Sequence, residues 1–79
     1  MFFIHVHTAA GENVGGDPVQ IAVSDFDRRA CLKGDLWLMR SLVEAEGLDW
    51  EDVTRIEAEV SADPDEVDPE VRVCYTRPQ

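Results

Sequence analysis

Several features that would assign a small protein to a familiar class are scarce in this sequence. Its 79 residues include two cysteines, Cys31 and Cys74, too few for the disulfide framework of small secreted domains. No window approaches the roughly 18 consecutive apolar residues of a membrane-spanning helix. The first residues also lack the basic start and the long apolar run of a signal peptide. We therefore expect a protein of the reducing cytoplasm.

Basic residues are scarce as well. Seven Lys and Arg stand against 17 Asp and Glu, which gives a formal net charge of −10 and a pI near 4.3. A surface that binds phosphates or anionic lipid needs charge of the opposite sign. We therefore expect no direct nucleic-acid binding and no membrane binding.

Motifs that carry chemistry are missing. The glycines between Gly11 and Gly16 are not followed by the Lys-Ser or Lys-Thr of a phosphate-binding loop. The acidic segment 63–70 lacks the central glycine and the ligand spacing of a calcium loop. Neither cysteine has a His and an acid at a spacing that indicates a nucleophile. The sequence predicts no catalytic residues, no cofactor and no resident metal, and we expect a protein that is not an enzyme.

Hydrophobic periodicity predicts the secondary structure. Alternating apolar residues indicate four strands, over residues 2–8, 19–24, 53–60 and 71–76. A capping box at Ser24-Asp25-Phe26-Asp27 predicts a helix start, and Gly47 its end. Gly34 lies inside this span and costs about 1 kcal/mol relative to Ala, so the helix could kink or restart there.

These elements predict one domain over residues 1–79 of the α+β class. The expected layout is ββαββ, a four-stranded antiparallel sheet with one helix packed on one face. The helix should face the core with the stripe Leu32, Leu36, Met39 and Val43. On the last strand Val71, Val73 and Tyr75 should face the helix and Cys74 should point away from it. This register predicts two free thiols.

The negative charge is concentrated in the second half of the chain. Residues 1–43 carry a net charge of −1 and residues 44–79 carry −9. Glu57 and Glu59 should project from the outer face of the third strand about 6.7 Å apart. Together with other acids nearby in sequence they would form a ridge, which we call the acidic ridge: Glu51, Asp52, Glu57, Glu59, Asp63, Asp65, Glu66, Asp68 and Glu70. The ridge suits a basic partner, although a merely solvated surface has the same composition.

Trp37 is a further candidate partner-binding residue. A helical wheel places it about 140° from the centre of the core stripe, on the side of Arg40 and Glu44. An exposed Trp beside Arg has the character of an interface anchor. The alternative is that Gly34 shifts the phase of the helix and Trp37 packs under the first hairpin.

In its size, its charge and its expected ββαββ layout, the whole chain resembles the small acidic inhibitors that phages encode, among them the anti-CRISPR proteins. The resemblance implies a non-enzymatic inhibitor that docks on a basic nucleic-acid-binding protein, such as a CRISPR surveillance complex or nuclease. It would block that partner as a nucleic-acid mimic. The resemblance assigns no role to any individual residue.

Three other interpretations stay open at the level of sequence. An immunity protein or antitoxin that caps a toxic nuclease would use an acidic face equally well. A small metal-binding protein could use His5 and His7, two residues apart on the first strand, with Cys74 as a further ligand. An accessory subunit could dimerise through the outer sheet face, where Phe3 and Ala22 interrupt the polar residues. The expected state is accordingly a monomer or a weak homodimer.

Overall fold

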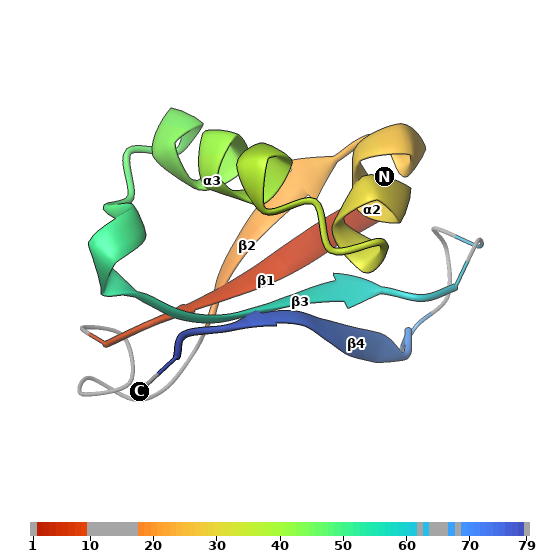
Figure 1. Ribbon diagram of the computed structural model, residues 1–79. Coiled ribbons are helices and arrows are strands. Elements are labelled where there is room, and N and C mark those ends of the chain that lie inside the picture. Colours follow the sequence, from red (N-terminus) through yellow and green to blue (C-terminus); the bar gives the residue numbers. More distant parts are fainter. Residues whose placement is uncertain (1, 10–17, 62, 64–66, 68, 79) are drawn as a thin grey trace.

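The computed structural model describes residues 2–9, 18–61, 63, 67 and 69–78. One antiparallel sheet, with strand order β2-β1-β3-β4, contains β1 (Phe2–Thr8), β2 (Val19–Val23), β3 (Val53–Glu59) and β4 (Val71–Thr76). The helices α2 (Asp25–Leu32) and α3 (Leu36–Ala45) lie on one side of this sheet (Figure 1). A short 3-10 helix, η1 (Trp50–Asp52), leads into β3. The α+β class and the four antiparallel strands are confirmed.

The prediction of a single helix is wrong, because Gly34 ends the first helix completely. Gly34 has a φ of +85°, a left-handed conformation that costs glycine little and other residues more. Its N–H donates to the carbonyl of Cys31 (2.9 Å), and the N–H of Asp35 donates to that of Ala30 (3.1 Å), the pattern of a Schellman motif. Asp35 then caps α3 by accepting the N–H of Leu38 at 3.1 Å. The layout is ββααββ.

The other predicted helix boundaries are confirmed. Ser24 caps α2, since its Oγ accepts the N–H of Asp27 at 3.1 Å. Gly47, at a φ of +80°, follows the end of α3, and the N–H of Leu48 donates to the carbonyl of Val43 at 3.2 Å. Neither helix of the described segments is long and apolar enough to cross a membrane.

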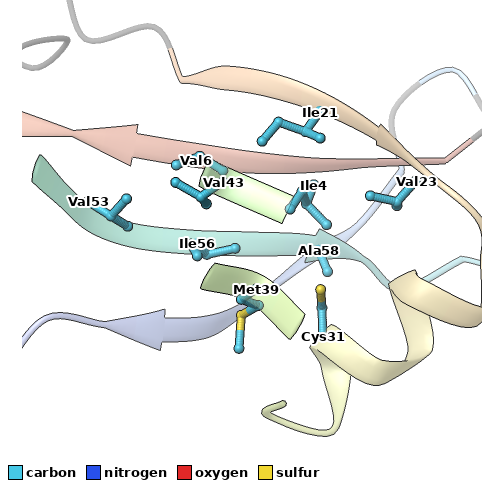
Figure 2. Packing of buried hydrophobic residues seen from close by; sticks show 10 residues of the cluster. All are labelled: Ile4, Val6, Ile21, Val23, Cys31, Met39, Val43, Val53, Ile56 and Ala58. Carbon is cyan, nitrogen blue, oxygen red and sulfur yellow. The ribbon is translucent and has the colours of Figure 1, made fainter. Parts of the chain in front are cut away.

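The hydrophobic core lies between the sheet and the two helices. Figure 2 shows its ten buried residues: Ile4, Val6, Ile21, Val23, Cys31, Met39, Val43, Val53, Ile56 and Ala58. Of the predicted helix stripe, Met39 and Val43 are fully buried. Leu36 is 50% exposed, because the break at Gly34 gives α3 its own orientation.

A β-bulge corrects the predicted faces of β4. Val73 pairs with Glu57, whereas Tyr75 pairs with Ile56, so Cys74 is the extra residue between them. Tyr75 therefore faces the core side as predicted, and its ring lies 4.9 Å from that of Trp50. Val73 lies on the outer face and Cys74 packs against the core. Val71, which pairs with Glu59, lies on the outer face as well. The predicted orientations of Val71, Val73 and Cys74 are wrong.

Substitution of Gly34 should measure backbone strain alone. A Cβ at this position would meet nothing within 4 Å, so Gly34→Ala should lower the free energy of unfolding by about 1–2 kcal/mol through the left-handed backbone. Gly34→Asn should cost less, because Asn tolerates this region. Urea unfolding measures the free energy of unfolding of both variants. A Gly34→Ala variant as stable as the wild type would contradict the left-handed backbone conformation of Gly34.

Candidate docking surface

Glu59, expected on the acidic ridge, is a structural residue. Only 6% of it is exposed, which contradicts the prediction that it faces solvent. The pairing of β1 with β3 begins at Ile4, so the N–H of Phe3 needs another acceptor. The Glu59 carboxylate accepts that N–H. Its carbonyl oxygen accepts a hydrogen bond from Arg28 at 2.8 Å.

Arg28 is the centre of this network, and sequence reasoning did not identify it. Its residue exposure is 3%. Nη1 donates to the carbonyls of Glu59 (2.8 Å) and Val60 (3.2 Å), while Nη2 donates to the Asp25 carboxylate at 2.6 Å. The guanidinium also lies 4.7 Å from the centre of the Phe2 ring. The hydrogen bond from Arg28 holds the pKa of Asp25 below its usual value.

Glu57 is engaged with neighbouring side chains. Its carboxylate lies 2.6 Å from Nε2 of His7, and the Glu57 side chain is only 19% exposed. Arg55 adds a second cation, with Nε 3.9 Å from the same carboxylate and Nη2 3.3 Å from Nε2 of His7. Because these groups satisfy one another, Glu57 is a poor candidate for a free anionic contact.

The other residues of the acidic ridge lie at two separate places. Glu51 and Asp52 are exposed before β3 begins, whereas Asp63 and Glu70 are exposed beyond its other end. The seven residues of β3 span about 20 Å. A continuous ridge is therefore not formed by the described residues. Asp65, Glu66 and Asp68 lie outside them.

The structure does not bring His5, His7 and Cys74 together as a metal site. His5 and His7 belong to the outer face of β1, while Cys74 packs against the core on the other side of the sheet. Among the residues that the structure describes, no group of three or more His, Cys, Asp or Glu side chains could hold a metal ion. The register of β4 is the reason, because it places Val73 on the outer face and so turns Cys74, the next residue, inward.

Exposed acids gather instead where α3 passes into η1. This group, called the acidic end, consists of Glu44, Glu46, Asp49, Glu51 and Asp52, all exposed. Glu44 is paired with Arg40 at 2.9 Å. Asp49 accepts the N–H of Glu51 at 3.0 Å. The last turn of α3 holds no basic residue, so Glu44 and Glu46 stand at the negative end of the helix dipole, where cations are favoured.

Trp37 is exposed, as one of the two sequence interpretations required. It is 81% exposed on α3 and does not pack under the hairpin. With Arg40, Ser41 and Glu44 it lines a surface hollow of about 270 Å³. Phe26 on α2 is also exposed, at 79%. Sequence reasoning missed Phe26, although its position off the core stripe was a usable signal.

Charge reversal should distinguish the structural acid from exposed ones. Glu59→Lys removes a charged acceptor and leaves the N–H of Phe3 unsatisfied, so the free energy of unfolding should fall by about 2–3 kcal/mol. Glu70→Lys makes the same charge change at an exposed residue and should change it by less than about 0.5 kcal/mol. If both variants changed the free energy of unfolding by the same small amount in urea unfolding, Glu59 would be an exposed residue, as the sequence predicted.

The thiols give a pH prediction. Both cysteines are free, as predicted. Burial raises the pKa of Cys31 from 9.0 to about 12, with a smaller contribution from Cys74. Between these values the unfolded chain loses a proton that the folded protein keeps. The contribution of the protonated Cys31 thiol to the free energy of unfolding is therefore complete below pH 9. It is lost as the pH rises from 9 toward 12, by about 1.4 kcal/mol per pH unit.

Urea unfolding at a series of pH values from about 8 to 10.5 would measure this loss. Cys31→Ala should make the decline shallower than in the wild type. A Cys31→Ala variant with an unchanged decline would show that another group causes it.

The chain was also compared with known proteins. No family model matches it, and no curated protein or solved structure does so either. The features of the surface that bear on function are Trp37 and the acidic end.

Proposed function

We propose that the chain is a non-enzymatic binding protein whose helical side docks on a basic surface of a partner protein. The observation that carries the proposal is the exposure of Trp37, at 81%, on the same helix that leads into the acidic end. Trp is among the residues that contribute most to binding energy when an interface covers them. A net charge of −10 supplies long-range attraction to a basic surface.

The placement of the acids supports attraction over simple solubility. Solubility is served by acids anywhere on the surface. At the C-terminal end of α3, however, Glu44 and Glu46 are each unfavourable by about 0.3–1 kcal/mol through the helix dipole. A cationic partner would offset this cost on binding. The acidic end is therefore better suited to a bound state than to the free protein.

The resemblance drawn from the sequence gives the proposal its specific form. The partner would be a cytoplasmic nucleic-acid-binding protein, such as a subunit of a CRISPR surveillance complex or a CRISPR nuclease. Docking would occupy the basic surface on which the nucleic acid normally lies, and the block would be steric and electrostatic. An immunity protein or antitoxin that caps a nuclease would use the same side of the molecule.

Binding to purified CRISPR effector complexes and to a basic nuclease domain tests the proposal. Trp37→Ala should lower the affinity at least tenfold, since a hot-spot Trp contributes about 2 kcal/mol or more. Its stability should change by less than about 0.5 kcal/mol, because the side chain is exposed. Association should also slow as salt rises from about 50 to 500 mM.

A matched pair of charge reversals locates the surface. Glu46→Lys lies in the acidic end and Glu70→Lys lies beyond the far end of β3, and both residues are exposed. The first should weaken binding much more than the second. The proposal fails if neither probe binds, or if the two reversals are equal and Trp37→Ala has no effect.

A further inference from the structure

The two cysteines lie in the same part of the hydrophobic core. Cys31 is fully buried on the side of α2 that faces the sheet. Figure 2 shows its sulfur pointing toward Ala58 of β3. Cys74 is turned inward on the neighbouring strand β4 and packs against the same core. The register that predicted two separate thiols, with Cys74 on the outer face, is therefore not the register of the folded chain.

The Cys74 thiol lies beside Ala58 as well. Burial raises the pKa of Cys74, and a hydrogen bond from the backbone of Ala58 partly offsets that rise. The thiol donates to the carbonyl of Arg72 at 3.4 Å, and strand pairing sets Arg72 opposite Ala58. Burial also raises the pKa of Cys31, and the charge of the Cys74 thiolate adds to that rise. Both thiols therefore lie next to one small residue and within range of each other's charge.

The backbones that carry the thiols are close too. Cα atoms of α2 and β4 come within 8 Å of each other, and disulfides usually join Cα atoms about 4.4–6.8 Å apart. In the described sheet β4 is an edge strand that pairs with β3 alone, so a small movement of β4 toward α2 disturbs no further strand. The fold thus offers the approach that a disulfide between α2 and β4 needs.

We propose that Cys31 and Cys74 form a redox pair, which an oxidant closes into an intramolecular disulfide that ties α2 to β4. In the structure both thiols are free, the state expected in a reducing compartment. Cys74 is half-buried and Cys31 is fully buried, so a small oxidant such as oxidised glutathione reaches Cys74 first. The inference does not depend on the proposed function, because no residue of the proposed docking surface takes part.

Thiol–disulfide exchange forms the bond in two steps. The Cys74 thiolate attacks oxidised glutathione, whose S–S bond breaks, and one glutathione leaves with the proton that Cys74 gave up. The Cys31 thiolate then attacks Sγ of Cys74, and the second glutathione leaves in the same way. Two protein thiols are oxidised to one disulfide, while one glutathione disulfide is reduced to two thiols. Because burial raises the pKa of Cys31 to about 12, the second step should be slow and should accelerate as the pH rises.

Equilibration with mixtures of reduced and oxidised glutathione tests the inference. After acid quenching and alkylation of free thiols, intact mass spectrometry should show a wild-type monomer with one disulfide and no bound glutathione. The equilibrium constant for this conversion should be about tenfold or more larger in native buffer than in strong urea, because the fold stabilises a bond that suits it. By the same linkage, the oxidised chain should unfold at a urea concentration higher by about 1 M or more than the reduced chain.

Single-cysteine variants identify the pair and the order of the two steps. Cys31→Ala should stop at a mixed disulfide between glutathione and Cys74. Cys74→Ala should react with oxidised glutathione far more slowly, since its remaining thiol is fully buried in the folded chain. Equal rates for the two variants would contradict the proposed order.

A wild-type chain that stays reduced, stops at a mixed disulfide or links two copies would overturn the inference. So would an equilibrium constant no larger in native buffer than in urea, since the fold would then oppose the bond. The comparison of native buffer with urea uses the wild type alone, so it holds even where a variant is destabilised. None of these outcomes depends on whether a basic partner binds the helical side.

Discussion

The arrangement of this protein depends on one buried cation. The guanidinium of Arg28 reaches from α2 to the backbone carbonyls at the end of β3 and is held by the Asp25 carboxylate. A buried charge is tolerated only when its donors are satisfied, and removal of one partner commonly costs about 3–5 kcal/mol. This contact fixes α2 over the sheet. Since Asp35 begins α3 directly after the Gly34 turn, the orientation of α3 follows from it.

Local signals in the sequence were sufficient for most of the elements. Alternation placed the strands, and the side-chain cap at Ser24 and the glycine at Gly47 placed two helix ends, because each depends on residues a few positions apart. Gly34 was recognised as a weak point, but one glycine inside a helical pattern does not say whether the helix bends or stops. That choice was decided by Asp35, which caps the next helix.

The errors concern contacts between residues far apart in the chain. Alternation correctly assigns Glu59 to the outer face, but its carboxylate accepts the N–H of Phe3, 56 residues away, and Glu59 is buried instead of exposed. Cys74 is the extra residue of a bulge in the pairing with β3, and a bulge breaks the alternation, so Val71 and Val73 before it face the opposite side of the sheet from Tyr75 after it. As a result, the candidate docking surface of the structure lies on the helical side, whereas the sequence predicted it on β3. Of the acidic residues expected to bind a partner, Glu51 and Asp52 also belong to the acidic end.

The junction between the two helices contains no spare residue. Asp35 completes the hydrogen bonds that end α2 and also caps α3. The distance between Phe26 on α2 and Trp37 on α3 therefore depends on the length of the three-residue connection between the helices, Lys33-Gly34-Asp35. One inserted residue there would shift α3 relative to α2, and would displace the two exposed aromatic rings relative to each other together with the core residues Met39 and Val43. Homologous chains that share a partner should accordingly tolerate length variation in their other loops but not at this corner.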